Sequence, residues 1–321
     1  MAKNLTPSVA IAMATYNGQT YLKEQLESLC SQTFQDFKLV IVDDASSDDT
    51  MTIIKTFTER LNIELHQNSH NLGYIKNFEK AISLSDAPYI APCDQDDIWL
   101  PNKLQTLLEN IGNATLIYSD SKLIDAHGNS LERTLSQKLK NNFISTTSPL
   151  PFVYDNCVSA HAILFKNELK KSIFPFPKHL YFDAWIAANA AMHHGIIYVN
   201  TALICYRQHE SNTLSQQKKA SLSLSKKIHQ KSAKKIQDHR TRTEIIDDLL
   251  KASELPIDDK NTLLQLKKGH VQFQSYWFNL SFFKTLLQHR RLLFAITKRQ
   301  TMMLCFKKAI GLKLYRFLPF L

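Results

Sequence analysis

Three aspartates stand within four residues in the segment Asp94-Gln-Asp-Asp97, and this group offers the clearest chemistry in the sequence. Neighbouring carboxylates repel one another and raise each other's pKa unless a cation lies between them. Their hard oxygen atoms suit Mg²⁺ or Mn²⁺, which would also bind the phosphate oxygens of a substrate diphosphate. The alternative is a loop that only caps a helix beginning near Pro101. The residues alone leave both interpretations open.

Two further polar groups, Thr15-Tyr-Asn17 and Asp43-Asp44, each follow a short apolar run. A carboxylate of the Asp43-Asp44 pair can accept a hydrogen bond from the imide N–H of a pyrimidine, and Tyr16 can stack on the same base. The alternative is that one of the two aspartates begins an Asx-turn before the next helix.

Three single residues later in the chain are also candidates. Asp183 precedes an apolar helical pattern, so it fits either a helix N-cap or a base that removes a proton from an alcohol. Arg207 could neutralise a phosphate and His209 could bind a metal, although either could equally be an ordinary surface or core residue. The sequence lacks the glycine-rich phosphate loops and the G-x-S-x-G elbow, which argues against those chemistries.

The elements that must position these groups alternate between strands and helices. Strands are expected at residues 9–14, 37–42, 63–65 and 88–91, with amphipathic helices between them. This alternation favours a parallel, doubly wound sheet, in which ligands bind at the carboxyl ends of the strands. All three polar groups fall at such ends, so we expect the active site at that edge.

The later pattern is less regular. Further strands are expected at residues 116–118, 160–165, 196–199 and 202–206, and a helix is expected to begin near Asp183.

Charge divides the 321-residue chain into two parts. The net charge is +10, but residues 213–321 alone hold 22 Lys and Arg against 7 Asp and Glu. From Asn261 to the end there is no acidic residue at all. We therefore expect a catalytic domain over residues 1–212 and a basic, helical region over residues 213–321, joined by a linker at Ser211 to Ser225.

Composition also limits the cellular setting. The five cysteines are widely spaced with no C-x-x-C pair, which favours reduced buried thiols over disulfides or a zinc site. No apolar run is long enough to span a bilayer, and the run at residues 9–14 is too short for a signal peptide. The expected location is the cytoplasm.

The C-terminal region mixes basic residues with bulky apolar ones, as in Tyr276-Trp-Phe278, Phe282-Phe283 and the run from His289 to Phe294. Basic amphipathic helices rich in Trp, Phe and Leu lie on anionic membrane surfaces. The alternative is a set of helices packed on the catalytic domain with a solvated basic face. Nucleic-acid binding is the weaker possibility, because the sequence has no RNP motif and no zinc finger.

Several stretches, in this order along residues 8 to 212, resemble the family 2 inverting glycosyltransferases: Val9-Ala-Ile-Ala-Met-Ala-Thr-Tyr-Asn-Gly18, Ser31-Gln-Thr-Phe34, Leu39-Val-Ile-Val-Asp-Asp-Ala-Ser-Ser-Asp-Asp-Thr50 and Asp94-Gln-Asp-Asp-Ile-Trp99 with Pro101-Asn-Lys-Leu104 after it. The ending Tyr206-Arg-Gln-His-Glu-Ser-Asn212 is similar to that of the bacterial rhamnosyltransferase-like branch.

The resemblance implies a GT-A fold, in which two abutting Rossmann-like halves share a mixed, mainly parallel sheet. It also implies a nucleotide-sugar donor and a bound Mn²⁺ or Mg²⁺. Carried onto this sequence, it gives donor-binding roles to Ala14, Tyr16, Asn17, Asp44, Asp94 and Arg207, metal contacts to Asp96 and His209, and the catalytic base to Asp183. The residue before that base is usually Glu or His in the family, whereas here it is Phe182.

The activity implied is an inverting, metal-dependent hexosyl transfer from a pyrimidine nucleotide sugar to a saccharide or lipid-linked saccharide. The rhamnosyltransferase-like ending leans toward dTDP-rhamnose, with UDP-hexoses next, and toward a bacterial surface polysaccharide such as O-antigen, lipopolysaccharide core or capsule. The expected setting is the inner face of the cytoplasmic membrane, without a nucleic-acid partner. The alternatives are a nucleotidyltransferase, which would release pyrophosphate, and a non-catalytic sugar-nucleotide-binding protein.

Overall fold

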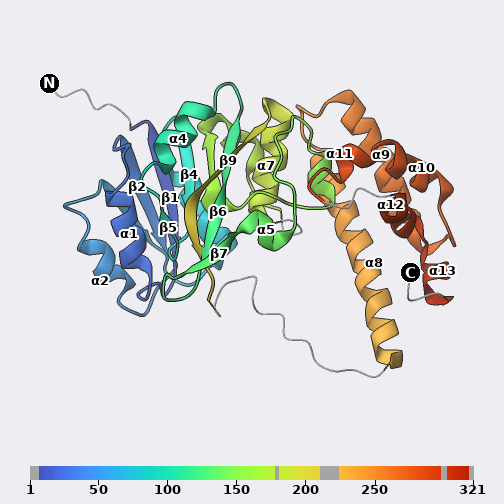
Figure 1. Ribbon diagram of the computed structural model, residues 1–321, viewed down its shortest axis with the longest axis horizontal. Coiled ribbons are helices and arrows are strands. Elements are labelled where there is room, and N and C mark those ends of the chain that lie inside the picture. Colours follow the sequence, from blue (N-terminus) through green and yellow to red (C-terminus); the bar gives the residue numbers. More distant parts are fainter. Residues whose placement is uncertain (1–6, 178–180, 210–223, 298–301, 318–321) are drawn as a thin grey trace.

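A nine-stranded sheet with helices on both sides forms one end of the molecule, and a group of helices forms the other (Figure 1). The computed structural model describes residues 7–177, 181–209, 224–297 and 302–317. The strands are β1 Val9–Thr15, β2 Phe37–Asp43, β3 Ile63–Gln67, β4 Tyr89–Cys93, β5 Ile98–Trp99, β6 Leu116–Ile124, β7 Ser130–Thr134, β8 Ile163–Lys166 and β9 Ile196–Arg207.

The α-helices divide between the two ends of the molecule. Those in the first part are α1 Leu22–Cys30, α2 Thr50–Lys55, α3 Tyr74–Leu84, α4 Lys103–Asn110, α5 Leu135–Leu139, α6 Lys170–Ile173 and α7 Phe182–His193. Those in the second are α8 Leu224–Leu249, α9 Ile257–Val271, α10 Leu280–Gln288, α11 Arg290–Leu293, α12 Met302–Ala309 and α13 Leu312–Phe317. Short 3₁₀ turns lie at η1 Leu150–Val153, η2 Ala160–Ala162, η3 Asn167–Leu169 and η4 Gln272–Gln274.

The first half of the sheet is parallel, in the order β3-β2-β1-β4, which confirms the expectation for these strands. The apolar runs of β1, β2 and β4 are buried, with helices on both faces of the sheet, as parallel strands require, whereas the edge strand β3 is only half-buried. The register pairs Thr15 with Asp43 and Met13 with Cys93. The three polar groups therefore do follow strands that end at one edge.

The second half departs from a purely parallel sheet. Strand β8 runs antiparallel to both β4 and β6, β5 is antiparallel to β9, and only β6 and β9 are parallel. The fully parallel sheet expected from the alternation of elements was thus wrong, and the mixed sheet implied by the family resemblance is correct.

Two local predictions also need correction. Residues 160–162 form a 3₁₀ turn, so the expected strand at 160–165 begins only at Ile163. The two strands expected at 196–199 and 202–206 are one strand, β9, because its pairing with β6 continues through irregular register near Asp120.

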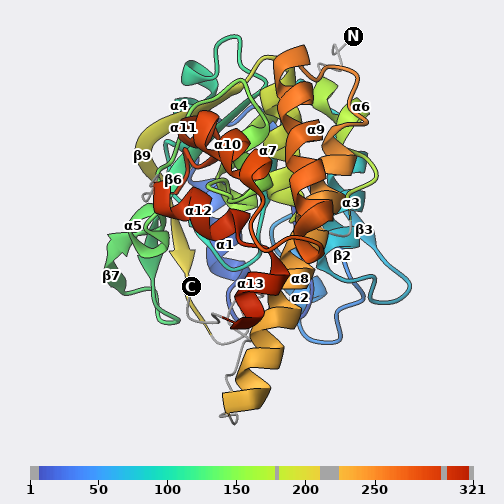
Figure 2. The ribbon, with the colours of Figure 1, turned by 90° about the vertical axis from the view of Figure 1, so that its right-hand side faces the viewer.

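Helix α7 joins the two ends of the molecule. Ten of its twelve residues are buried, so it is covered on nearly every side and lies between the sheet and the C-terminal helices (Figure 1). Its Trp185 shares one hydrophobic cluster with Ile246 of α8, Leu263 of α9 and Phe282 of α10. Viewed from the C-terminal end, these helices stand in front of the sheet (Figure 2).

The expected helical C-terminal region is therefore present and packs on the first part. The linker expected at Ser211 to Ser225 lies outside the described residues, except that Leu224 and Ser225 begin α8. Within the described ranges, no helix has the length and apolar character needed to cross a bilayer. All five cysteines are free thiols, three of them buried.

Candidate active site

The acidic loop at residues 94–97 connects β4 to β5 and is fastened to the end of β1. The Tyr16 backbone N–H donates to Gln95 Oε1 at 2.9 Å, and Gln95 Nε2 donates back to the Tyr16 carbonyl at 3.0 Å. We call this pair of hydrogen bonds the Gln95–Tyr16 clamp. A Cβ atom at Gly18 would lie 2.4 Å from Gln95 Oε1, so the absence of a side chain at Gly18 leaves room for the Gln95 amide. The loop and the β1 turn thus form one unit.

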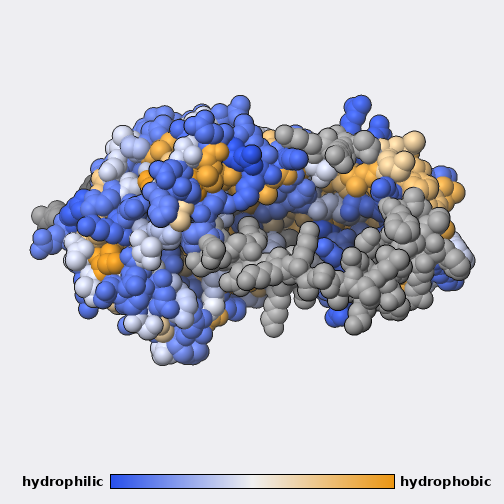
Figure 3. Space-filling view, turned by 60° about the horizontal axis from the view of Figure 1, so that its bottom comes forward, coloured by the Kyte–Doolittle hydropathy of each residue, from blue (hydrophilic) through white to orange (hydrophobic). Residues whose placement is uncertain are grey.

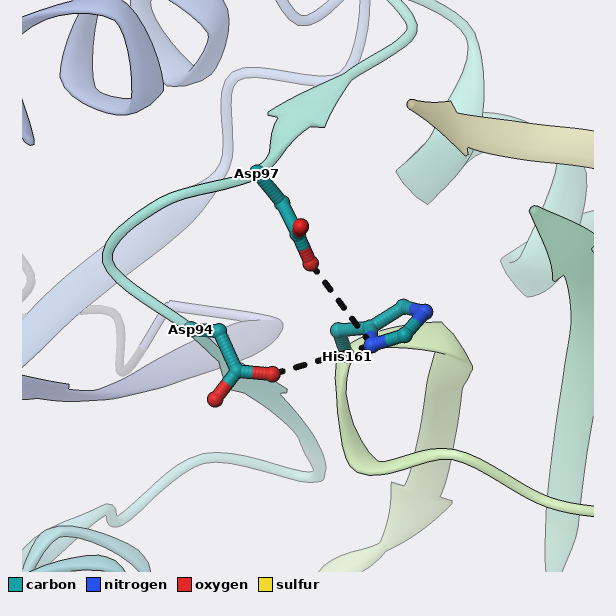
Figure 4. Close-up of side chains that lie close together, drawn as sticks. All are labelled: Asp94, Asp97 and His161. Carbon is teal, nitrogen blue, oxygen red and sulfur yellow. Dashed lines mark ion pairs between the residues drawn. The ribbon is translucent and has the colours of Figure 1, made fainter. Parts of the chain in front are cut away.

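Asp94 and Asp97 of this loop converge on a histidine from elsewhere in the chain (Figure 4). Nδ1 of His161 lies 3.6 Å from Asp94 Oδ2 and 3.6 Å from Asp97 Oδ2. The three ligand-type atoms all lie within 4.8 Å of one another. They form a compact group that combines two carboxylates with one imidazole nitrogen.

Asp97 is completely buried and only half satisfied. Its Oδ1 accepts the Arg207 backbone N–H at 3.1 Å, whereas its Oδ2 finds no hydrogen-bond partner among the described residues. Burial, together with the charges of Asp96 and Asp94, raises the pKa of Asp97 to about 8. An oxygen in this state is poorly accommodated unless a proton or a cation reaches it.

His161 is held from three sides. Its ring Nε2 lies 2.9 Å from Ser121 Oγ, its ring packs 4.6 Å from that of Tyr206, and its carbonyl accepts from the buried Lys103 Nζ at 2.6 Å. Burial lowers the pKa of His161, but the carboxylates of Asp97 and Asp94 overcome that effect and leave the pKa above its ordinary value. The imidazole is therefore fixed in place facing the acidic loop.

A second pair adjoins this group, because His209 Nε2 lies 2.9 Å from Asp96 Oδ2. The structure thus brings together the two residues that were expected to contact a metal. The ring of His209 also packs 5.0 Å from that of Tyr21. Residues 210–212, which complete the motif beginning at Tyr206, lie outside the described residues.

Arg207 is buried, and its side chain links the acidic loop to the start of α1. Its Nε donates to the Asp96 carbonyl at 2.9 Å, its Nη2 pairs with Glu24, and its guanidinium lies 4.6 Å from the Tyr21 ring. These contacts hold the acidic loop against β9 and α1. A phosphate contact by Arg207 stays a prediction.

Asp183 lies in the first turn of α7, where it is half-buried. Its Oδ1 accepts from Asn156 Nδ2 at 3.2 Å and from the Ala184 backbone N–H at 2.6 Å. Burial raises the pKa of Asp183 to about 6, with His161 lowering and Asp94 raising it. Asp183 is therefore close enough to the acidic loop for the charges there to change its pKa. The N-cap role considered for it is wrong, because Tyr181 is the N-cap and Asp183 already lies inside the first turn. Its role as a base stays a prediction.

The residues expected to bind the nucleotide base of the donor lie at the ends of β1 and β2. Asp44 is buried and accepts hydrogen bonds from Asn68 Nδ2 and from the backbone N–H groups of Leu72 and Gly73. These contacts fix the loop before α3, so a contact between Asp44 and a base stays a prediction. Tyr16 keeps 47% of its surface exposed, as a stacking platform needs.

Nearby residues shape this turn. Ala14 lies within β1, partly buried, and Asn17 adopts φ 45° while its Oδ1 accepts from the Ser47 backbone N–H at 2.9 Å. Asp43 accepts from the Ser46 N–H at 2.9 Å, three residues further on, so this bond holds the turn after β2 but is not the Asx-turn considered for this pair, in which the bond goes two residues on.

Both acidic groups fit a divalent cation. The buried Asp97 Oδ2, which has no hydrogen-bond partner among the described residues, and the convergent Asp94 and His161 atoms supply the oxygen-rich ligand set that Mn²⁺ or Mg²⁺ prefers. Asp96 of the same loop offers a second set together with His209. The sequence pointed to Asp94 and Asp96 but not to His161. A histidine inside an apolar run signals a buried polar group, but nothing in the sequence names its partners.

Comparisons with known proteins point to one family and one fold. A model of the family described as Glycosyl transferase family 2 matches residues 10–170, half of the chain. The uncharacterized glycosyltransferase MJ1057 of Methanocaldococcus jannaschii is 36% identical over 140 residues, which cover 42% of this chain and 48% of that protein. The chain spans about half the length, or less, of the curated relatives it matches.

Two solved structures share the fold. S. aureus TarS 1-349 in complex with UDP-GlcNAc superposes with a TM-score of 0.61 at 18% identity, covering 96% of this chain and 89% of that one. The mannosyltransferase PcManGT from Pyrobaculum calidifontis, in complex with GDP-Man and Mn²⁺, gives a TM-score of 0.52 at 13% identity, covering 99% and 89%. At these identities the likeness establishes the architecture, which is the GT-A fold with a helical C-terminal region.

Proposed function

The chain belongs to glycosyl transferase family 2, and from this premise we propose that it transfers a sugar from a nucleoside-diphosphate sugar to a hydroxyl group of a saccharide acceptor. One observation carries the proposal. A half-buried carboxylate, Asp183, with a pKa of about 6, lies within electrostatic reach of Asp94 and His161 in the acidic group at the carboxyl ends of the strands. The transfer requires a proton acceptor for the acceptor hydroxyl and, in the same site, a group that can hold a cation to stabilise the departing diphosphate.

The reaction we propose is a single displacement. Asp183 takes the proton of the acceptor hydroxyl as the acceptor oxygen bonds to the anomeric carbon, and the bond from that carbon to the diphosphate oxygen breaks. One displacement inverts the anomeric configuration. Asn156 and the start of α7 orient the Asp183 carboxylate, so the base is aimed before the acceptor arrives.

The divalent cation would be held on the acidic loop, by Asp94, Asp97 and His161 or by Asp96 and His209. When bound, such an ion supplies positive charge that stabilises the departing diphosphate. The clamp between Gln95 and Tyr16 keeps the loop at the end of β1, where the nucleotide is expected.

For the donor we propose a pyrimidine nucleotide, with dTDP-rhamnose ahead of UDP-hexoses. The exposed Tyr16 ring supports base stacking, and one structural neighbour was solved with UDP-GlcNAc while another holds GDP-Man. We further propose that residues 1–212 act as the catalytic domain in the cytoplasm, at the membrane, and build a bacterial surface polysaccharide such as O-antigen on a lipid-linked saccharide.

The test is to identify the product released from each donor. The purified chain is incubated with dTDP-rhamnose or UDP-hexoses, Mn²⁺ and oligosaccharide acceptors, and the nucleotide and sugar products are separated by chromatography. The proposal is supported by release of nucleoside diphosphate together with a glycoside product in which NMR shows the transferred sugar linked with the anomeric configuration opposite to that in the donor. Release of pyrophosphate would favour nucleotidyl transfer, and binding without turnover of any donor would favour a non-catalytic binder.

A further inference from the structure

Six large apolar residues lie exposed near the end of the chain and form what we call the C-terminal apolar face. The exposed fraction is 57% for Leu280, 63% for Met302 and 58% for Met303. The complete face comprises Tyr276, Trp277, Leu280, Met302, Met303 and Phe306. Isolated exposed apolar residues are ordinary, but six within 31 residues need an explanation.

Contacts between the underlying elements make this one surface. Helix α10 packs against α12, and Phe306 lies 5.1 Å from the Phe278 ring and 6.3 Å from the Phe283 ring. The turn before α10 is tied to the end of α12, because the Gly311 N–H donates to the Trp277 carbonyl at 2.9 Å. Apolar surface gathers at this end of the molecule on the right of Figure 3.

The exposed charged residues on the helices that carry the face are cationic, Lys284 on α10 and Lys307 on α12. Arg291 on α11 and Lys313 on α13 are exposed as well, and no acidic residue occurs anywhere from Asn261 to the C-terminus. An apolar centre with a cationic rim is the combination that adsorbs to anionic lipid, since the side chains enter the acyl boundary while lysines meet the headgroups.

We propose that the C-terminal apolar face docks the protein on an anionic membrane surface. A second copy of the chain fits less well, because a two-fold contact through this face would set its lysines against like charges. Nucleic acid fits less well too, because aliphatic Leu and Met side chains offer bases no stacking platform. The docked state brings the catalytic end, which packs on the same helices, close to lipid-linked molecules.

The tryptophans provide a direct readout. Of the three in the chain, Trp99 is 1% exposed, Trp185 is 8% exposed and Trp277 is 50% exposed. Fluorescence of the full chain is measured while vesicles of phosphatidylcholine, pure or with about a third phosphatidylglycerol, are added. We expect a blue shift with the anionic vesicles only, reversed by about 0.5 M salt and absent from Trp277→Phe.

Binding itself is measured by flotation of the same vesicles. The variant with Leu280→Ser, Met302→Ser and Met303→Ser should bind the anionic vesicles at least tenfold less than the unaltered chain. Each of these three residues is more than half exposed, so the variant should fold normally, which thermal melting checks. The matched control carries Leu131→Ser, Leu139→Ser and Ile257→Ser, three exposed apolar residues off this face, and should bind like the unaltered chain.

Four results would overturn the proposal, and three of them concern vesicle binding or self-association. These are flotation equal for neutral and anionic vesicles, flotation equal for the two triple variants, and a concentration-dependent dimer in sedimentation that only the Leu280, Met302 and Met303 variant loses. Binding of random RNA or DNA with no binding of vesicles would assign the basic rim to nucleic acid instead. Neither donor nor acceptor is present in these measurements, so their outcome is independent of the proposed transfer activity.

Discussion

Asp183 is the residue on which the proposed chemistry depends most. Replacing it with Asn keeps the shape of the side chain and the bond to the Ala184 N–H but removes the proton acceptor. We expect transfer by Asp183→Asn to fall about a thousandfold, with nucleotide binding unchanged. Because burial raises the folded-state pKa of this carboxylate, its ionised form opposes folding at neutral pH.

The variant should therefore melt at the same temperature or higher, which separates loss of the base from loss of the fold. Single-turnover kinetics and thermal melting on the same sample make the measurement. Transfer within a fewfold of the unaltered chain would remove Asp183 as the base.

The same pKa predicts a pH profile. A base must be ionised to act, so kcat/KM should fall as pH drops through about 6, by about tenfold per unit below it. The rate profile is measured at saturating Mn²⁺ with the fold checked at each pH. A profile that is flat from pH 7 to about 4.5 would mean that no group with this pKa acts as base.

The sequence predicted the aspartates of the site but not the histidine His161 that contacts two of them. Asp94, Asp96 and Asp183 stand out because carboxylates cluster or precede a helix, which are local signals. The approach of His161 to Asp97 depends on how β8 and β4 pair, since the two residues are 64 positions apart. No pattern along the chain carries that pairing.

The turn after β1 can lie against the acidic loop because Gly18 has no side chain that would collide with Gln95. Gly18→Ala would place a Cβ atom against Gln95 and displace its amide from the Tyr16 backbone. Since both lost hydrogen bonds are partly accessible to water, we expect a loss of about 1 kcal/mol in the free energy of unfolding and weaker nucleotide binding.

The control is Gln95→Ala, which removes the same two hydrogen bonds without the steric conflict and should lose a similar amount. Chemical denaturation and nucleotide titration of both variants make the comparison. If Gly18→Ala matches the unaltered chain in both, the clamp has no role in holding the site.

A buried histidine pair joins α8 to α9. His239 Nδ1 lies 2.9 Å from His270 Nδ1, and the His239 ring stacks 3.8 Å from the Phe273 ring. Burial lowers the pKa of His239 to about 3 and that of His270 well below its ordinary value. The charged groups facing His239 are Asp238, which raises its pKa, and the cations Lys235, Lys308 and Arg242, which lower it further.

Between pH 6.5 and the folded-state pKa, the unfolded chain binds more protons at this position than the folded one. Stability should therefore decline as pH falls below 6.5, by about 2 kcal/mol at pH 5 for His239. The variant His239→Leu, which keeps an apolar contact with Phe273, should lose that part of the decline. The test is urea denaturation of both chains at pH 7 and 5, and an identical decline in the two would contradict the prediction.

Most elements were predictable because their signals are local. The buried strands β1, β2 and β4 are short apolar runs, and α7 is a mostly apolar helical pattern in which Asn189 is the one polar residue between Asp183 and His193. The direction of β8 was not predictable, because an apolar run reads the same whichever way it pairs. The continuity of β9 through Asn200 was missed because polar residues interrupt its apolar run, while its pairing with β6 resumes at Ala202 after an irregularity in register.

On the scale of the whole molecule, one hydrophobic cluster crosses the expected boundary at residue 212. Phe182 and Val153 of the first part and Leu249 and Phe294 of the second are buried in the same cluster. Truncation of the chain after the linker would expose these apolar side chains to water and destabilise the first part, so a truncated chain is not a clean test of membrane docking. Point substitutions on the C-terminal apolar face avoid this difficulty.

The proposed transfer requires that the edge formed by β1, β2 and the acidic loop bind a nucleoside diphosphate together with a divalent cation. The most direct test is the thermal stability of the full chain with UDP, dTDP, GDP or CDP, each with and without Mn²⁺, beside the variant Asp96→Asn. Ligand at a hundredfold excess over Kd stabilises the folded chain by about 2.7 kcal/mol. We predict such a shift with one pyrimidine diphosphate, larger with Mn²⁺, and loss of the Mn²⁺ increment in Asp96→Asn. No shift with any nucleotide, in a chain that unfolds cooperatively, would mean that this edge does not bind nucleoside diphosphates.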